Sequence, residues 1–440
     1  MEKPETIFAL ATGMGRSAIA VIRLSGPSAS VVIEAIAGSA PVAREARPVY
    51  FHDPESREVI DRGLLLWFPG PNSVTGEDYA EFQIHGGRAV VDQFSRVLSR
   101  FSGLRVAEPG EFARRGLANG KMDLSQVEGL ADLIDAETEF QRRQAMRTLG
   151  GALRRRVEGW RSAIVQALAL VEAELDFSDE GDVEFEPQAA LGHILRPMLA
   201  EMQELRRQAP SAERLRDGFV VLILGPPNSG KSTLLNMLAK RDVAIVSAIP
   251  GTTRDMIEVH LDLHGMPVTL VDTAGLREAA DEIERLGVAR SLARAEQADL
   301  ILWLSEGGRI APPDEHFGAA GNALDLLYVS TKADIFSAAP GHLAISAQTG
   351  LGLDSLFDEI LERAKARLGD GSTALLTRQR HRELVEKAES CVASALLVDK
   401  PLEFAADDLR AAGRALGRIV GAVDVEQILD AIFAQFCIGK

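Results

Sequence analysis

The sequence predicts a mixed fold: an α/β domain inserted into a helical domain, with a small α+β domain before both. Strands alternate with helices in residues 216–368, as in α/β domains built on a parallel sheet. Apolar residues recur at helical spacing on both sides of this region. Short apolar runs separated by turn residues occupy the first 120 residues. We therefore expect domains at 1–120, 121–215, 216–368 and 369–440, with the second and fourth forming one helical domain.

The composition of the 440-residue chain is that of a folded, acidic protein. Hydrophobic residues make up 46% of it, enough for buried cores. The formal net charge of −16 argues against a surface that coats nucleic acid, although a local basic face is compatible with it. Cys391 and Cys437 form neither a disulfide framework nor a zinc motif, so we expect a cytoplasmic protein. We expect no signal peptide and no membrane span, because the basic-apolar leader and long apolar runs that mark them are missing.

The N-terminal domain is expected to contain three strands and a helix. The strand-like runs cover residues 19–24, 63–68 and 81–84, and each is followed by a glycine-containing turn. Residues 89–98 have a helical pattern. His85 stands next to two glycines and could contact a ligand, although a structural hydrogen bond is the commoner role of a loop histidine.

The helical domain contains one long amphipathic helix. Its apolar residues follow steps of three and four, an almost heptad pattern: Leu149, Leu153, Val157, Trp160, Ile164, Leu168, Val171 and Leu175. The pattern is short for a coiled coil, so a helix of a bundle is the commoner alternative. After residue 375 the chain becomes helical again, with segments near 384–395 and 409–436. Cys391 falls on an apolar helix face and is expected in the core.

A phosphate-binding loop follows the first strand of the α/β domain. The apolar run 219–224 leads into Gly225-Pro-Pro-Asn-Ser-Gly-Lys-Ser232, which matches G-x-x-x-x-G-K-[ST]. Backbone N–H groups of such a loop and the N-terminus of the next helix bind phosphates. Lys231 is expected to reach the β- and γ-phosphates, and Ser232 to bind Mg²⁺.

Two further elements have the order and spacing found in Ras-like GTPases. Apolar residues alternate through 257–263, then a turn leads into a strand that ends in Asp272-Thr-Ala-Gly275. This D-x-x-G sequence places a carboxylate beside Mg²⁺ and an N–H beside the γ-phosphate. Gly251-Thr-Thr-Arg-Asp255 lies where a nucleotide-dependent switch loop is expected.

The base-recognition element is Thr331-Lys-Ala-Asp334, which follows a strand. Most GTPases have asparagine at its first position, so Thr331 bears on affinity, whereas Asp334 is expected to accept hydrogen bonds from guanine. Ser346-Ala347 resembles the last guanine-contacting loop. Five elements in the correct order predict a Ras-like P-loop G domain that binds and hydrolyses GTP.

Motifs along the whole chain resemble the bacterial MnmE (TrmE) family of tRNA-modification GTPases. The residues that carry the resemblance are the P-loop with Asn228, the loop 251–255, and the segments 21–26, 67–73, 108–112, 272–278 and 436–440. The resemblance implies further nucleotide contacts. The full predicted set is Asn228, Ser229, Gly230, Lys231, Ser232, Thr233, Ser247, Thr252, Thr253, Asp272, Thr273, Ala274, Gly275, Thr331, Lys332, Asp334, Ser346 and Ala347.

The resemblance also implies how hydrolysis is catalysed. Leu276 occupies the position of the usual water-orienting glutamine, and in this family K⁺ takes the role of an arginine finger. The implied metal ligands are Ser232 and Thr253 for Mg²⁺, and Asn228, Ser247, Ile249 and Thr252 for K⁺. Glu284 matches the acidic residue that orients the attacking water. The residues alone favour a turn role for Asn228 and a solvated helix charge for Glu284, and Arg254 and Arg277 are alternative arginine fingers.

For the N-terminal domain, the resemblance implies a folate-binding-like fold that dimerises. It binds 5-formyl- or 5,10-methylene-tetrahydrofolate, and the matching residues are Arg23, Glu81, Lys121 and Lys440. Cys437 belongs to a terminal Cys-Ile-Gly-Lys motif, so it is either a catalytic thiol near the folate or a small buried residue. A prenylated C-terminus does not fit, because the last residue is Lys440.

The resemblance implies an enzyme that modifies carbon 5 of the wobble uridine (U34) of tRNA. It would work with the flavoprotein MnmG (GidA) as a heterotetramer built on a homodimer, with K⁺-dependent pairing of the G domains. FAD would belong to the partner, because no G-x-G-x-x-G follows a strand here. The alternative is a regulatory, RNA-binding GTPase of the Era type that acts in ribosome assembly. No KH-type module supports that alternative.

Overall fold

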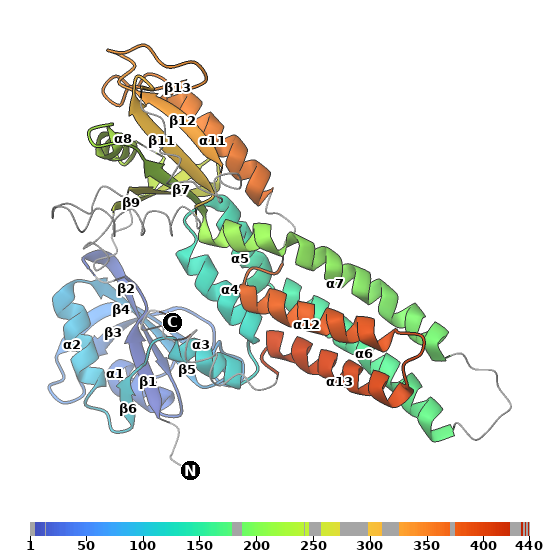
Figure 1. Cartoon of the computed structure of the whole chain (residues 1–440). Coiled ribbons are helices and arrows are strands. Elements are labelled where there is room, and N and C mark those ends of the chain that lie inside the picture. Colours follow the sequence, from blue (N-terminus) through green and yellow to red (C-terminus); the bar gives the residue numbers. More distant parts are fainter. Residues whose placement is uncertain are drawn as a thin grey trace, which may run out of the picture. The chain divides into compact units, whose positions relative to one another are not determined.

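A computed structural model describes the chain at residues 5–13, 15–177, 187–241, 243–245, 257–272, 298–309, 325–369 and 375–422, with Phe433, Phe436 and Gly439 (Figure 1). The chain divides into two compact units. The first comprises Met1–Ala131, Arg154–Arg161 and Leu416–Lys440, and the second comprises Asp132–Leu153 and Ser162–Ala415. Among the described residues, no helix is both long and apolar enough to cross a membrane.

The first unit contains a six-stranded sheet in the order β3-β4-β5-β2-β1-β6. Its strands are β1 (Thr6–Leu10), β2 (Ser17–Ser25), β3 (Arg47–His52), β4 (Val59–Phe68), β5 (Tyr79–Gly86) and β6 (Leu104–Val106). Only the β1–β6 pair among them is parallel. The helices that follow the strands are α1 (Ala29–Ala37), α2 (Arg88–Leu98), α3 (Glu111–Ala118) and α4 (Leu124–Asp135). The expected strands at 19–24, 63–68 and 81–84 and the helix at 89–98 correspond to β2, β4, β5 and α2.

Aromatic packing fixes α2 on this sheet. The Phe94 ring of α2 lies 5.4 Å from the Phe51 ring of β3 and 5.2 Å from the Phe82 ring of β5, between centroids. All three side chains are fully buried. Edge and tilted arrangements at this separation are favourable for aromatic rings, so the cluster stabilises the contact beyond the area that it buries.

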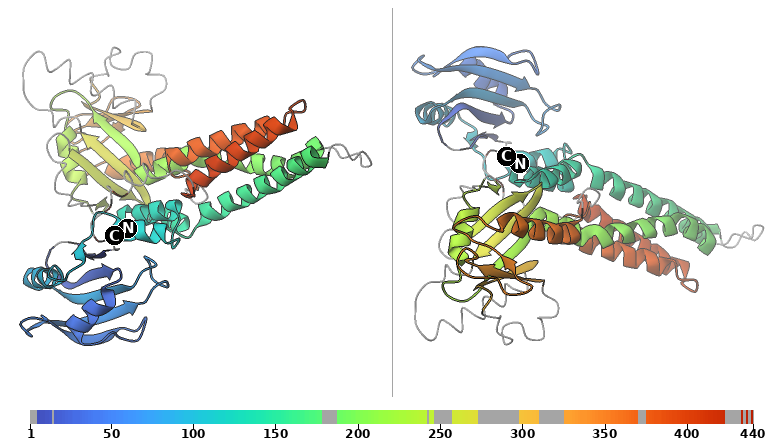
Figure 2. Two further views of the ribbon diagram at one scale, coloured as in Figure 1. Left: turned by 90° about the horizontal axis from the view of Figure 1, so that it is seen from below. Right: turned by 90° about the horizontal axis from the view of Figure 1, so that it is seen from above.

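The helices of the second unit lie side by side along much of their length (Figure 2). They are α5 (Glu139–Leu149), α6 (Ala152–Phe177), α7 (Pro187–Asp217), α12 (Gln379–Ala395) and α13 (Leu402–Ile419), parts of α6 and α13 being assigned to the first unit. From Leu153 onward the almost heptad pattern is confirmed as one helix, α6, with Val157, Trp160, Ile164 and Val171 buried. The expected start at Leu149 is wrong, because Leu149 ends α5 and the glycines 150 and 151 separate the two helices. The helix α7 was not anticipated, because its sequence contains Pro197 and Pro210.

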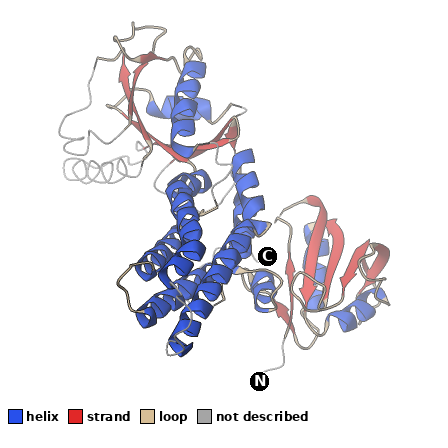
Figure 3. Ribbon diagram, turned by 90° about the vertical axis from the view of Figure 1, so that its right-hand side faces the viewer, coloured by secondary structure: helices blue, strands red, loops and turns tan. Residues whose placement is uncertain are grey.

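The G domain of the second unit is built on a seven-stranded sheet in the order β13-β12-β11-β7-β10-β9-β8 (Figure 3). The strands are β7 (Phe219–Leu224), β8 (Ala244–Ile245), β9 (Ile257–Leu263), β10 (Met266–Asp272), β11 (Leu300–Glu306), β12 (Leu326–Thr331) and β13 (Leu343–Ala344), and the described helices are α8 (Lys231–Leu238) and α11 (Leu353–Leu368). β7 is parallel to both of its neighbours, whereas β9 and β10 form the expected antiparallel hairpin. The expected fold class is confirmed.

Contacts at two places hold the G domain to the helices within this unit. The turn of the β9–β10 hairpin rests on α5, where Phe140 N donates a hydrogen bond of 3.3 Å to Gly265 O. At the other contact, Arg214 of α7 and Arg367 of α11 both pair with buried Asp299, at 3.3 and 3.6 Å. The hairpin strand that ends at Asp272 therefore begins at a turn seated on the helical domain.

Candidate nucleotide-binding site

The P-loop connects the C-terminal end of β7 to the N-terminus of α8. A Cβ on Gly225, whose φ is +151°, would lie 2.2 Å from Leu304 O, so only glycine fits between the loop and β11. Asn228 has a φ of +64°, in the left-handed region that asparagine tolerates. Gly230 is the N-cap of α8, so the first N–H groups of this helix face the loop.

Lys231, the first residue of α8, is folded over this loop. Its Nζ donates hydrogen bonds to the carbonyl oxygens of Gly225 at 2.8 Å and Pro226 at 2.9 Å. Burial lowers the pKa of Lys231, and the negative charge of Asp272 opposes the shift. An ammonium group that is partly removed from water and lies at the N-terminus of a helix suits an anionic ligand such as a phosphate.

Ser232 and Asp272 meet at the same edge of the sheet. Because β10 is parallel to β7, with Asp272 opposite Ile223, its carboxyl end lies beside the P-loop. Ser232 Oγ donates a hydrogen bond of 3.2 Å to Asp272 Oδ2, and Asp272 is 1% exposed. One hydroxyl and one buried carboxylate leave further positions of an octahedral Mg²⁺ for phosphate oxygens and water, which is how this ion binds in nucleotide sites.

The two base-recognition loops lie next to each other although they are separated in sequence. Ala333 N donates to Ile345 O at 3.0 Å, and Ile345 N donates to Ser330 O at 2.9 Å. The side chain of Ser346 is fully buried and accepts a hydrogen bond from Thr349 N at 3.2 Å. These bonds hold 331–334 and 346–347 together, with Asp334 exposed at the surface.

Thr331 lies against the P-loop, since a Cβ on Gly230 would be 4.0 Å from Thr331 Cβ. The Thr331 and Ser229 hydroxyls are both buried and have no hydrogen-bond partner in the described part of the chain.

Sequence reasoning missed Glu306, whose carboxylate pairs with the Lys332 ammonium. The only signal for Glu306 is its position at the end of β11, opposite Thr331 in a parallel pair.

Several predicted residues lie outside the described part of the chain. They are Ser247, Ile249, Thr252, Thr253, Arg254, Thr273, Ala274, Gly275, Leu276, Arg277, Glu284, Cys437 and Lys440. The described site therefore comprises the P-loop, Ser232 with Asp272, and the two base-recognition loops.

In the first unit, Arg23 and Glu81 face each other across β2 and β5. Arg23 Nε lies 3.3 Å from Glu81 Oε1, and Arg23 Nη1 donates a hydrogen bond of 3.1 Å to Gly439 O in the C-terminal segment. Tyr79, which sequence reasoning missed, donates from Oη to Glu81 Oε1 at 2.7 Å. Burial raises the pKa of Tyr79, so this hydroxyl stays a hydrogen-bond donor at neutral pH.

Other predicted residues of the first unit have described surroundings. Lys121 N donates to Gly116 O at 2.7 Å, and a Cβ on Gly76 would lie 3.3 Å from Lys121 Cε. His85 lies in β5 and not in the expected loop, and its Nδ1 is 2.8 Å from Asp61 Oδ1, a structural hydrogen bond as expected. Cys391 is only partly buried, and burial raises the pKa of its thiol.

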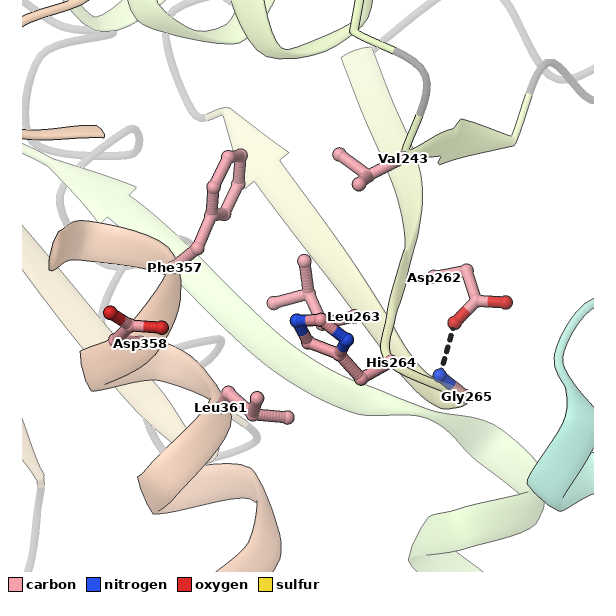
Figure 4. A pocket seen from close by; sticks show the side chains of 8 residues that line it. All are labelled: Val243, Asp262, Leu263, His264, Gly265, Phe357, Asp358 and Leu361. Atoms are coloured by element: carbon pink, nitrogen blue, oxygen red, sulfur yellow. Dashed lines mark hydrogen bonds between the residues drawn. The ribbon is translucent and has the colours of Figure 1, made fainter. Parts of the chain in front are cut away.

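A cavity of about 340 Å³ lies away from the P-loop, between the turn of the β9–β10 hairpin and α11 (Figure 4). It is lined by Val243, Asp262, Leu263, His264, Gly265, Phe357, Asp358 and Leu361. None of these residues belongs to the predicted nucleotide set. The cavity therefore belongs to the turn of the hairpin and not to the nucleotide site.

The loop between β7 and α8, the Ser232–Asp272 pair and the base-recognition loops define a P-loop GTPase. Family models agree: that of the N-terminus of GTP-binding protein TrmE matches residues 6–121, and that of the MnmE helical domain matches residues 124–437. The chain belongs to the MnmE (TrmE) family.

Relatives match over the full length of the chain. It is 51% identical over 438 residues to the tRNA modification GTPase MnmE of Beijerinckia indica subsp. indica, covering 99% of this chain and 96% of that protein. It is 52% identical over 451 residues to the protein of the same name from Methylobacterium sp. (strain 4-46), covering 99% and 100%. Among solved structures, a single-residue variant of Aquifex aeolicus Era bound to GDP·AlF4⁻ is 28% identical with a TM-score of 0.27, covering 33% of this chain and 56% of that chain.

Proposed function

We propose that this GTPase is a cytoplasmic enzyme that modifies carbon 5 of the wobble uridine (U34) of tRNA, to an aminomethyl or carboxymethylaminomethyl group. The observation that carries the proposal is the match of about half of all residues, over nearly the whole chain, to proteins named tRNA modification GTPase MnmE. The first unit and the helical regions are part of this match, so it extends beyond the G domain that many GTPases share. That extent favours the modifying enzyme over a regulatory switch of the Era type.

The nucleotide site would use the described residues as follows. Lys231 would exchange its two carbonyl contacts for the β- and γ-phosphate oxygens of GTP. Ser232 and Asp272 would hold Mg²⁺ together with Thr253, which lies outside the described residues. Asp334 accepts hydrogen bonds from guanine, while Lys332, aligned by Glu306, supports the base. Bound Mg²⁺ supplies positive charge that offsets the charge developing on the phosphates. Support comes from the closeness of Ser232 to buried Asp272 and from the partly desolvated Lys231.

For hydrolysis we propose K⁺ ligation by Asn228, Ser247, Ile249 and Thr252, and orientation of the attacking water by Glu284. Pairing of two G domains would complete this site and depend on K⁺. The left-handed backbone of Asn228 agrees with both the turn role and ligation, because asparagine tolerates this conformation, and the support for ligation is the family match. Arg254 and Arg277 are the alternative arginine fingers, which would supply the positive charge in place of K⁺. An Asn228→Ala variant that keeps its K⁺-stimulated hydrolysis would eliminate Asn228 as a ligand.

In the first unit we propose a tetrahydrofolate site formed by Arg23, Glu81, Lys121 and Lys440, with Cys437 as the reactive thiol. The cofactor, 5-formyl- or 5,10-methylene-tetrahydrofolate, would supply the one-carbon unit. The hydrogen bond from Arg23 to Gly439 supports the proposal, because it brings the terminal segment to the strand that carries Arg23. Tyr79 would orient the Glu81 carboxylate toward a pterin amino group.

The proposed assembly is a homodimer that joins the flavoprotein MnmG in a heterotetramer and acts on tRNA. The flavin and nicotinamide chemistry would belong to MnmG. The net charge of −16 supports a role for the partner in binding tRNA, because an acidic chain depends on a partner or a local basic face to hold tRNA phosphates.

Mass spectrometry of nucleosides from bulk tRNA tests the proposal, comparing the source bacterium with a strain that lacks this gene. We expect 5-substituted wobble uridines to disappear, and to return with the intact gene but not with Asp272→Asn. Unchanged modification in a strain without a second copy would contradict the proposal and favour the regulatory switch.

A further inference from the structure

An apolar surface lies at the turn between α12 and α13. Three large side chains there are mostly in solvent: Leu397 is 59% exposed, Val398 81% and Phe404 61%. They border a hollow of about 590 Å³ that is also lined by Asp399, Lys400, Pro401, Asp407 and Asp408. Single exposed apolar residues are common, but a group around one hollow is typical of an interaction site. We call these three residues and their acidic neighbours the α12–α13 tip.

The turn is held in a defined conformation. The Lys400 ammonium pairs with the Asp408 carboxylate and donates to Ser394 Oγ at 2.6 Å, so it joins the end of α12 to the second turn of α13. Leu397 N donates to Ser394 O at 3.3 Å. On α13 the neighbours Ala405 and Leu409 are fully buried, which fixes the helix so that Phe404 faces outward. The exposure of the three apolar side chains therefore follows from well-packed structure.

Charge restricts what can cover this surface. Residues 399–410 contain four carboxylates and two cations. Lys400 pairs with Asp408, and Arg410 pairs with Asp407 at 3.0 Å. Within the described residues no ion pair neutralises Asp399 or Glu403, both of which are exposed. A surface of this kind repels the phosphates of RNA and complements a protein segment in which lysine or arginine flanks an apolar side chain.

We propose that the α12–α13 tip docks a protein partner that packs an apolar side chain against Phe404 and Leu397 and places basic side chains beside Asp399 and Glu403. This inference rests on the proposed function, which supplies the partner to test, MnmG from the same bacterium. The apolar contact would carry most of the affinity, and the carboxylates would set its salt dependence.

Calorimetric titration of the full-length protein with purified MnmG tests the proposal in three variants. Phe404→Ser should weaken binding by at least about tenfold, as for truncation of an aromatic residue at the centre of an interface. Glu403→Gln should weaken it less and flatten its dependence on salt. Val165→Ser is the matched control, because Val165 is 64% exposed on α6 and lies outside the tip; its affinity should stay within about twofold of the wild type. All three variants should hydrolyse GTP at the unstimulated rate of the wild type, which verifies their folding.

The other outcomes are distinguishable. Equal affinity of Phe404→Ser and wild type would overturn the inference and leave the partnership with MnmG intact. Failure of the wild type to bind MnmG would refute the partnership in the proposed function, and the inference with it. If Phe404→Ser instead lowers self-association in sedimentation velocity while MnmG binding is unchanged, the tip contacts a second copy and the inference is wrong.

Discussion

Gly225 shows how a single residue sets the shape of the P-loop. Its missing side chain lets the loop pass within contact of Leu304 O, where a Cβ would lie 2.2 Å away, and its φ of +151° is strained for other residues. We expect Gly225→Ala to weaken GTP binding by about tenfold or more, since strain of ~1–3 kcal/mol must be relieved by moving the loop. Fluorescent-nucleotide titration measures the effect.

Gly159→Ala is the control for Gly225→Ala. Gly159 lies within α6, and nothing is within 4 Å of the position of its Cβ. We expect this variant to bind GTP normally and to gain up to ~1 kcal/mol of stability, because alanine favours the helix. Normal binding by Gly225→Ala as well would mean that the loop is not set by its contact with β11.

Asp334 is the residue that we expect to select guanine. Its carboxylate is exposed next to the buried Ser346 loop, where it can accept from the N–H groups of guanine. We expect Asp334→Asn to reduce affinity for GTP about 100-fold, because an amide donor then faces the guanine donors and leaves them unpaired. The same variant should gain affinity for XTP, whose extra carbonyl accepts. Loss of affinity for both GTP and XTP would indicate misfolding and not a change in base selectivity.

Glu111 makes the stability of the first unit depend on pH. It is 6% exposed and is held between Arg105 at 2.6 Å and Arg115 at 2.8 Å. Burial alone would raise its pKa, but the hydrogen bonds of the two arginines and of Glu108 N lower it to about 2 from 4.5. A lowered folded-state pKa stabilises the protein above pH 4.5, and this contribution falls as the pH drops from 4.5 toward 2.

We therefore expect Glu111→Gln to lower the free energy of unfolding at pH 7 by ~2–4 kcal/mol, because Arg105 and Arg115 each lose the buried one of their two carboxylate partners. The difference from the wild type should shrink from pH 4.5 downward. Urea unfolding followed by Trp67 and Trp160, in a Trp303→Phe background, reports on this unit. Glu158→Gln is the control in the same unit: Glu158 pairs with Arg154 at 2.7 Å, but its side chain is 51% exposed and solvent screens the pair. An equal effect in both variants would contradict a role for burial.

At the scale of elements, motifs and periodicity predicted the parts of the fold with strong local signals. The alternation of apolar residues through 257–263 predicted the strand β9. The apolar residues spaced three and four apart predicted the helix α6. The helix α7 escaped prediction because Pro197 and Pro210 are local breakers that packing overrides. Glu306 and Tyr79 escaped because their roles depend on strand register, which a single sequence does not reveal.

The turn of the β9–β10 hairpin packs closely against the helix α5. Its turn residue Gly265 has a φ of +91°, and a Cβ there would lie 2.7 Å from Phe140 Cδ2 on α5. We expect Gly265→Ala to destabilise the second unit by ~1–3 kcal/mol, from backbone strain and the clash together. Phe140→Ala should also destabilise it, because packing is lost.

The double variant separates these causes. With Phe140 shortened the clash disappears, so the combined loss should be smaller than the sum of the single losses by ~0.5–3 kcal/mol. Urea unfolding followed by Trp303, in a background without Trp67 and Trp160, measures each value. Additive losses would show that the hairpin turn does not press on α5.

At the scale of the whole molecule, the described nucleotide site belongs to the second unit and the proposed folate residues Arg23 and Glu81 belong to the first. A ligand that binds only the folded state stabilises the part of the chain that holds its site. GDP with Mg²⁺ should therefore raise the unfolding midpoint of the second unit and leave that of the first unchanged. At about 100 times the dissociation constant, the expected gain in the second unit is about 2.7 kcal/mol.

The three tryptophans allow this prediction to be tested unit by unit. Trp303 lies on β11, opposite Leu224 at the start of the P-loop, whereas Trp67 and Trp160 belong to the first unit. In thermal unfolding, nucleotide should shift the Trp303 signal but not the signal of the other two. Lys231→Ala should abolish the shift, because the contact with the phosphates is lost. An equal shift of both signals would mean that the two units unfold together, and nucleotide state could then be transmitted to the first unit through stability alone.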